Sequence, residues 1–213
     1  MKKFYVISNY CSIRNKVVMI KENIVYTGSC AGFREFSNDI YRTFSLSYPK
    51  FHKMDNLNKL GFLSVELLLR DKNLNQKYAG DEIGIILMNA SSSLDTDRCH
   101  QNSITDHTNY FPSPSVFVYT LPNVVIGEIS IRHKIFGEGN FFITEKFNPN
   151  FLVTCVEQLL DYETTQCCIA GWVEINGNDY ESIVFLIEKP DRTEEGIVNF
   201  EAANIYNIYI KKK

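Results

Sequence analysis

Ile83-Gly-Ile-Ile-Leu-Met88 and Cys168-Ile-Ala-Gly-Trp-Val173 are short stretches that contain no charged side chain. A strand that is apolar at every position is buried on both faces, as in the centre of a sheet covered by helices. Shorter runs rich in β-branched and aromatic residues, each bounded by polar residues, predict further strands at 4–8, 17–21, 141–144, 183–188 and 205–210.

Helical patterns separate these strands. Residues 56–69 carry leucines at steps of three and four, and residues 121–135 repeat apolar side chains after Pro122, which suits a first helical turn. A third helix should begin with Asn148 as its N-cap and Pro149 at its first position. A turn at 176–179 joins two strands, and the chain is expected to finish in β structure. This alternation predicts an α/β layered fold in a single domain over residues 1–213.

Composition excludes several classes of function. The 213 residues are 45% hydrophobic and 22% charged, with a formal net charge of −3. Apart from the three terminal lysines there is no cationic block, so we expect no nucleic-acid partner. No apolar run is long enough to span a bilayer, so we expect no membrane insertion. The six cysteines form no C-x-x-C pair, which favours reduced thiols in a cytoplasmic protein without a metal or cofactor.

Four segments together resemble the β-ketoacyl synthases. They are Tyr48-Pro-Lys-Phe-His-Lys-Met-Asp55, the buried strand and small-residue loop at 83–97, Leu121-Pro-Asn-Val-Val-Ile-Gly-Glu-Ile-Ser-Ile-Arg-His-Lys-Ile-Phe-Gly137, and Ile169-Ala-Gly-Trp-Val-Glu174. Their order and spacing agree with the family over residues 48–190, whereas residues 1–45 match poorly. The resemblance implies the N-terminal half of a thiolase-like fold, with a mixed sheet of about five strands covered by helices on both faces. The family's second half, which supplies two active-site histidines, is not expected after Glu188.

The nucleophile of the family is also missing. The resemblance implies a cysteine on the turn between a strand and a helix, where the helix N-terminus lowers the pKa of a thiol. The matching segment is 140–151, and the turn position falls on Lys146 or Phe147. Cys155, inside the helix, is expected in the core. We therefore assign no catalytic residue.

Other reactive side chains are better explained by structure than by catalysis. Lys146 could form a Schiff base only if desolvated, and a surface lysine is the simpler interpretation. Asp95 and Asp97 could bind a cation or could cap a helix. The remaining candidates, interpreted as buried thiols, loop hydroxyls and structural histidines, are Cys167, Cys168, Ser91, Ser92, Ser93, His52, His100, His107 and His133.

Some members of the family lack the cysteine and act as chain-length factors, which pair with an active synthase. The resemblance implies that Phe141, Phe142, Ile143 and Thr144 form the subunit interface; the alternative is that they are ordinary core of a monomer. It also places the segment 111–120 where the partner's acyl chain would end. Phe117 and Tyr119 are the candidates for a steric stop there.

Three functions remain open. The first is a non-catalytic partner of a full-length β-ketoacyl synthase in fatty acid, polyketide or aryl-polyene biosynthesis, as a heterodimer or a homodimer. The second is a condensing enzyme component with a split active site or a substitute nucleophile. The third is a domain that binds an acyl carrier protein or a lipid, for which Arg132, His133, Lys134 and Lys146 could supply a basic patch.

Overall fold

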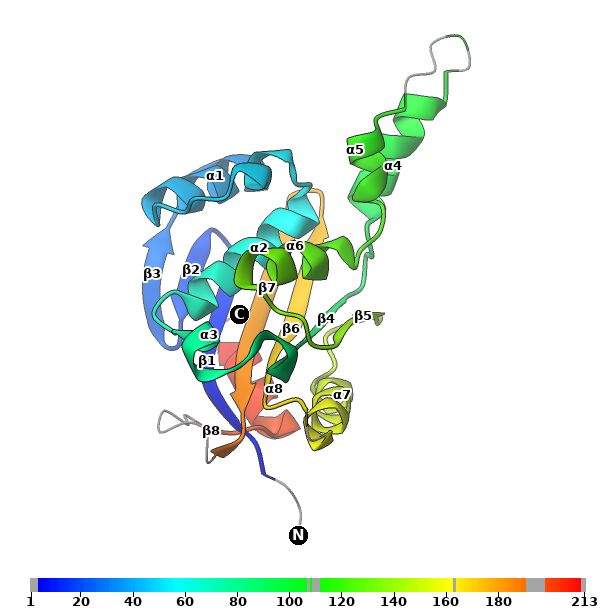
Figure 1. Ribbon diagram of the computed structural model, residues 1–213. Helices are drawn as coiled ribbons and strands as arrows, with labels where there is room; N and C mark the ends of the chain where they lie inside the picture. The colour runs from blue at the N-terminus through cyan, green and yellow to red at the C-terminus, as the bar shows by residue number, and fades with distance from the viewer. Residues whose placement is uncertain (1–3, 107, 109–111, 163, 191–197, 212–213) are drawn as a thin grey trace.

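The computed structural model describes residues 4–106, 108, 112–162, 164–190 and 198–211. Its centre is one mixed sheet of eight strands, ordered β3-β2-β1-β7-β6-β4-β5, with β8 paired to β1 (Figure 1). The pairs β4–β6 and β4–β5 are parallel, and the other pairs are antiparallel. The strands are β1 (Val6–Arg14), β2 (Val17–Ile20), β3 (Asn23–Thr27), β4 (Ile83–Asn89), β5 (Gly139–Ile143), β6 (Cys167–Asn176), β7 (Asp179–Glu188) and β8 (Val198–Asn199).

The mixed α/β sheet was predicted correctly, but its expected size of about five strands was wrong. The hairpin β2–β3 and the short β8 extend it beyond the predicted core. Strand β1 is also longer than the predicted 4–8, because its polar residues are buried with partners. Asn9, for example, donates from its side chain to the Leu68 carbonyl at 2.6 Å.

Helices cover both faces of the sheet. They are α1 (Phe33–Thr43), α2 (Asn56–Leu69), α3 (Leu74–Lys77), α4 (Leu94–Ile104), α5 (Pro114–Val118), α6 (Val124–His133), α7 (Pro149–Asp161) and α8 (Ala202–Lys211), with 3₁₀ turns at Pro49–Lys53 and Gly80–Glu82. One core cluster joins the sheet to α1, α2 and α6, and a second joins it to α7 and α8. The neighbours Cys167 and Cys168 fall in different clusters, as side chains on successive residues of a buried strand must.

Two helix predictions are confirmed at their starts. The Asp55 carboxylate accepts from the Asn58 amide at 2.8 Å and caps α2. The Asn148 side chain accepts from the Phe151 amide at 3.1 Å, with Pro149 as the first residue of α7. The predicted turn at 176–179 is also present, and Gly177 has the positive φ of 64° that its geometry requires.

Two other predictions need correction. The segment 205–210, expected as a strand, lies within helix α8, which directs Ile205 and Ile208 toward the sheet. The chain therefore does not finish in β structure. Helix α6 begins at Val124 rather than 121, so Pro122 precedes it. It ends at His133 and is followed by the C-cap Lys134, whose φ of 54° is left-handed.

Candidate functional site

Strand β5 is the last strand at one side of the sheet. It pairs with β4 along one edge, and no other described strand pairs with its second edge. Its central residues are only partly buried, and Ile143 is 51% exposed. An edge of this kind presents a row of N–H and C=O groups that can extend the sheet with another chain.

The predicted interface residues lie on this edge strand and just after it. Phe141 packs against the core under α2 and α6, whereas the ring of Phe142 meets Phe151 of α7 edge-on at 5.2 Å. Each phenylalanine is therefore half-buried on its own face of the sheet, and Ile143 is the more exposed. Thr144 follows β5: its amide donates to the Asn89 carbonyl of β4 at 2.9 Å, and its hydroxyl donates to the Lys146 carbonyl at 3.1 Å.

The turn between β5 and α7 carries no thiol. Lys146 is exposed to solvent, unlike the desolvated amines that form Schiff bases. Phe147 is buried, with its ring centroid 6.0 Å from that of Trp172 and 4.8 Å from that of Tyr209. Cys155 lies in α7 and is half-buried, where burial raises the pKa of its thiol. The turn position that the sequence predicted is thus occupied by an exposed lysine and a buried aromatic ring.

The two residues predicted at the end of an acyl tunnel face different environments. Phe117, in α5, is 57% exposed, and its ring lies 5.4 Å from that of His100 in α4. Tyr119, directly after α5, is only 8% exposed and turns inward toward Glu128 of α6. Phe111, at the start of the same predicted segment, lies outside the described residues.

Exposed apolar side chains are concentrated in one part of the chain, from α4 to β5. Of the thirteen large apolar side chains that are exposed among the described residues, seven lie between positions 94 and 143. They belong to α4, α5, α6, β5 and the turns beside them; in Figure 1, α4, α5 and β5 lie on the right, and α6 lies near the middle of the view beside α2. These residues are Leu94, Phe117, Val118, Leu121, Ile131, Phe136 and Ile143. Clustered exposed apolar side chains mark interaction surfaces more often than scattered ones do.

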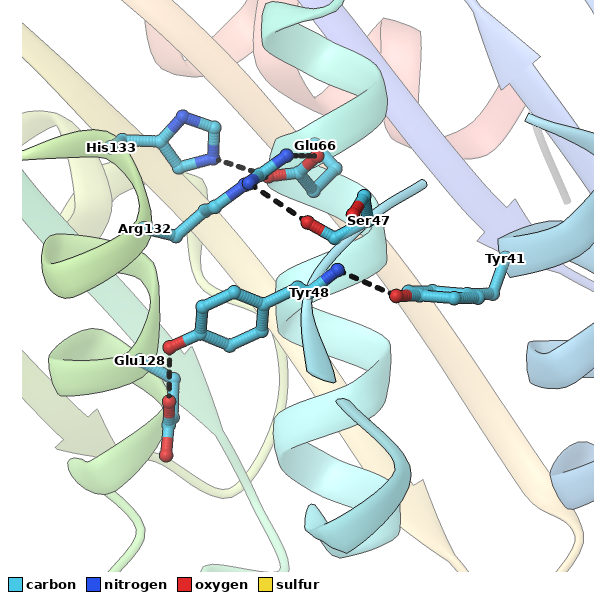
Figure 2. Close-up of polar contacts among 7 residues, drawn as sticks. All are labelled: Tyr41, Ser47, Tyr48, Glu66, Glu128, Arg132 and His133. Carbon is cyan, nitrogen blue, oxygen red and sulfur yellow. Dashed lines mark hydrogen bonds and ion pairs between the residues drawn. The ribbon is translucent and has the colours of Figure 1, made fainter. Parts of the chain in front are cut away.

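A polar network missed by the sequence interpretation holds α6 to α2 (Figure 2). Glu66 of α2 is buried and accepts from Arg132 at 2.6 and 3.2 Å, and His133 Nε2 lies 3.1 Å from its carboxylate. Burial alone would raise the pKa of Glu66, but His133 and Arg132 outweigh it, and the pKa falls below its usual value. A single acid in a leucine-rich helix was the available signal, because a buried carboxylate needs a partner.

A second buried carboxylate, that of Glu128, lies on α6 about one helical turn before Arg132. Glu128 accepts from the Tyr48 hydroxyl at 2.9 Å and pairs with Lys50 at 3.3 Å. Burial, followed by the hydrogen bond to Glu128, raises the pKa of Tyr48 to about 12. Two residues of α6 therefore fasten it to the segment before α2: Glu128 through Tyr48 and Lys50, and Arg132, which also donates to the Ser47 carbonyl at 3.1 Å.

This network changes the expected basic patch. Arg132 and His133 are directed at Glu66, whereas Lys134 and Lys146 are exposed. Two of the four residues therefore serve an internal ion pair, which weakens the case for a carrier-protein surface formed by these four.

Polar side chains just after β4 form hydrogen bonds to two distant segments of the chain. The Ser93 hydroxyl donates to the Thr120 carbonyl at 2.6 Å and also lies 3.1 Å from the Asp97 carboxylate. Asp95 accepts from the Gly177 amide at 2.6 Å. Both aspartates lie in the first turn of α4 and have partners within the protein, but neither caps the helix. The described residues hold no group of three or more potential metal ligands.

The cysteines and histidines considered as catalytic candidates have structural surroundings where the structure describes them. Burial raises the pKa of the Cys167 and Cys168 thiols, which disfavours the thiolate that a nucleophile needs. The ring of His52 packs edge-on against Tyr41 and Phe51. His107 lies outside the described residues. No helix in the described part of the chain is both long and apolar enough to cross a membrane.

Comparisons with known proteins rest on structure alone. No protein-family model matches the sequence, and no curated protein matches it significantly. Solved structures do match. One is the ishigamide ketosynthase/chain length factor, with a TM-score of 0.67 and 16% identity over 90% of this chain and 63% of that chain.

Two further matches have the same fold. The AntDE:AntF complex, a type II PKS acyl-carrier protein with its ketosynthase bound to the hexaketide, gives a TM-score of 0.61 and 10% identity over 90% of this chain and 65% of that chain. The ketosynthase ApeO in complex with its chain length factor ApeC, from Xenorhabdus doucetiae, gives 0.57 and 12% over 88% of this chain and 80% of that chain. This chain spans less than two thirds of the length of the first two matched chains. It has a thiolase-like fold of the ketosynthase/chain-length-factor type.

Proposed function

We propose that this chain is a non-catalytic partner subunit, similar to a chain-length factor, of a full-length β-ketoacyl synthase in polyketide, polyene or fatty acid biosynthesis. The observation that carries the proposal is an open, partly apolar β5 edge that runs directly into a turn without a nucleophile. Decarboxylative condensation requires a thiolate to carry the acyl chain, so a subunit with Lys146 and Phe147 at this turn depends on another chain for the chemistry.

In this proposal, β5 pairs antiparallel with the corresponding strand of the synthase. Main-chain hydrogen bonds would provide the pairing, and Phe141, Phe142 and Ile143, with Thr144 at the end of the strand, would lie in the interface. The exposed apolar side chains of α5 and α6 would add buried area on either side. Two of the solved structures that match this chain are described as a ketosynthase with its chain length factor, which supports the same arrangement here.

The test is co-expression with a full-length, cysteine-containing synthase from the same gene neighbourhood. Size-exclusion chromatography would measure the complex, and an assay with malonyl-carrier protein would measure condensation. We expect a stable complex in which condensation needs both chains and only the synthase becomes acylated. Acyl label on this chain alone, without a complex, would overturn the proposal in favour of a substitute nucleophile. A homodimer of this chain that excludes the synthase would refute the proposed heterodimer.

A pair of matched variants locates the interface. Ile143→Lys places a charge on the open β5 edge, and Ile24→Lys places the same charge on β3 at the opposite edge of the sheet. Both isoleucines are largely exposed, so neither change should unfold the chain alone. We expect Ile143→Lys to weaken the complex by at least about tenfold and Ile24→Lys to leave it unchanged. Equal effects of the two variants would refute pairing through β5.

A further inference from the structure

A cleft of about 770 Å³ lies at the end of the sheet where β1 and β6 finish and β7 begins. Its walls come from the turn between β1 and β2, from the turn between β6 and β7, and from Ser91 after β4. Every side chain that lines it carries a polar or charged group, which suits a polar ligand rather than an acyl chain. The charged residues among them are Arg14, Lys16, Glu174, Asp179 and Glu181.

The last residue of β1 places a buried positive charge at this cleft. Arg14 lines the cleft and is only 5% exposed. Its Nη1 donates to the Tyr209 carbonyl at 3.2 Å, and its guanidinium carbon lies 5.0 Å from the centre of the Tyr209 ring. Its Nε and Nη2 are buried and have no hydrogen-bond partner within the described residues. Because a buried donor without a partner is costly, these two nitrogens call for an acceptor.

The two unpaired nitrogens of Arg14 are the pair that can hold a carboxylate side-on. The guanidinium group is planar, and the N–H bonds of Nε and Nη2 point in the same direction from one of its edges. A carboxylate fits such an edge with two parallel N–H···O bonds, which are stronger and more directional than hydrogen bonds between neutral groups. Tyr209 is bound through Nη1, so it leaves this edge of Arg14 unoccupied.

The acidic side chains of the cleft do not occupy this edge of Arg14. Glu181 lies 3.9 Å from Nη1, and it accepts from the Trp172 indole at 3.1 Å and from a tyrosine hydroxyl of α8 at 2.8 Å. Glu174 accepts from two backbone amides directly after β4, at 2.6 and 3.1 Å. Protein donors therefore hold both carboxylates. Their charges, together with that of Asp179, disfavour a ligand with more than one negative charge.

We propose that the cleft binds a small molecule with a single negative charge, and that Arg14 holds the carboxylate of this ligand through Nε and Nη2. Lys16 adds a second cation beside Arg14, and the exposed side chains of Asn176 and Asn178 can form hydrogen bonds to the rest of the ligand. None of these residues belongs to the subunit interface proposed above, so binding does not depend on a synthase partner.

Binding is tested on this chain alone by NMR, with sodium acetate as the probe and sodium chloride at the same ionic strength as the control. Because Arg14 is buried, its Nε–H should exchange slowly enough with water to be observed. We expect acetate to shift this signal and the Asn178 backbone amide in a saturable way, and chloride to leave both unchanged. An Arg14 Nε–H signal that does not respond to acetate would overturn the proposal. Inorganic phosphate, a dianion above neutral pH, should bind more weakly, and tighter binding of phosphate would overturn the assignment of a single charge.

Two matched variants test the role of the guanidinium group. Arg14→Lys keeps the positive charge but lacks the paired donors, so we expect the affinity for acetate, measured at the Asn178 amide, to fall by at least about tenfold. Arg42→Lys should leave the affinity unchanged, because Arg42 is 79% exposed at its side chain and does not line the cleft. Equal affinities of Arg14→Lys and the wild type would overturn the proposal. If Arg14→Lys does not fold, the response of Arg14 in the wild type still decides it.

Discussion

Replacing Arg132 by alanine tests whether the ion pair between α2 and α6 holds this side of the fold together. Glu66 is 6% exposed at its side chain and Arg132 is 32% exposed, so the change leaves a buried carboxylate with only His133 beside it. Removing one partner of a buried pair costs about 3 to 5 kcal/mol. We expect the lower end, about 3 kcal/mol, because Arg132 is partly reached by water.

The assay is urea unfolding followed by the fluorescence of Trp172, the only tryptophan in the sequence and a buried one. For a slope of about 2 kcal/mol per molar urea, a loss of 3 kcal/mol lowers the midpoint by about 1.5 M. Arg42→Ala is the control, since Arg42 is 79% exposed at its side chain and lies 3.8 Å from Asp39. Its midpoint should move by less than about 0.5 M.

A double-mutant cycle refines the prediction. Glu66→Gln in the Arg132→Ala background removes the stranded charge, so the double variant should be less destabilised than the sum of the two single variants. A midpoint for Arg132→Ala within error of the Arg42→Ala control would refute the reasoning, and so would strict additivity of the two changes.

Three further predictions concern the core, the pH dependence and the thiols. Gly171→Ala should destabilise the protein by about 3 kcal/mol or more, measured in the same urea titration, because an added Cβ would lie 2.1 Å from the Ile183 carbonyl oxygen. The folded-state pKa of Glu66 is lowered from 4.5, so its contribution is complete above about pH 4.5 and is lost as the pH falls through the folded value. The difference in unfolding free energy between the wild type and Glu66→Gln should therefore shrink in acid; a constant difference from pH 6 to pH 3 would contradict this. Under native conditions iodoacetamide should label the exposed Cys99 and spare the buried Cys167 and Cys168, as read by peptide mass spectrometry, and labelling of all three at equal rates would show that the β6 assignment is wrong.

The central strands could be predicted because burial on both faces leaves an unbroken apolar run, as at 83–88 and 168–173. The first strand was underestimated for the opposite reason. Asn9 and Arg14 break the apolar pattern of β1, yet both are buried, and their partners come from distant segments. Only the fold brings Leu68 and Tyr209 beside them.

The C-terminal helix was misassigned because its period is ambiguous. Residues 205–210 alternate enough apolar side chains to suit a strand, while Ile205 and Ile208 are also spaced for one face of a helix. Packing beside α7 decided between the two. At the candidate site, sequence alone indicated the turn at Lys146 and Phe147 but could not tell which aromatic side chain near α5 faces inward. That choice depends on Glu128, on a different helix.

The open edge of β5 has a consequence for how much of this chain a cell can make relative to its proposed partner. An unpaired strand edge can pair with further copies of the same chain as readily as with a partner subunit. Copies made in excess would therefore associate with one another or be degraded. Under the proposed pairing, balanced synthesis of the two subunits removes this hazard, because the partner covers each new β5 edge soon after folding. We therefore expect the amount of this chain in a cell to follow that of the proposed synthase partner, and deletion of the partner's gene to lower the steady-state level of this chain.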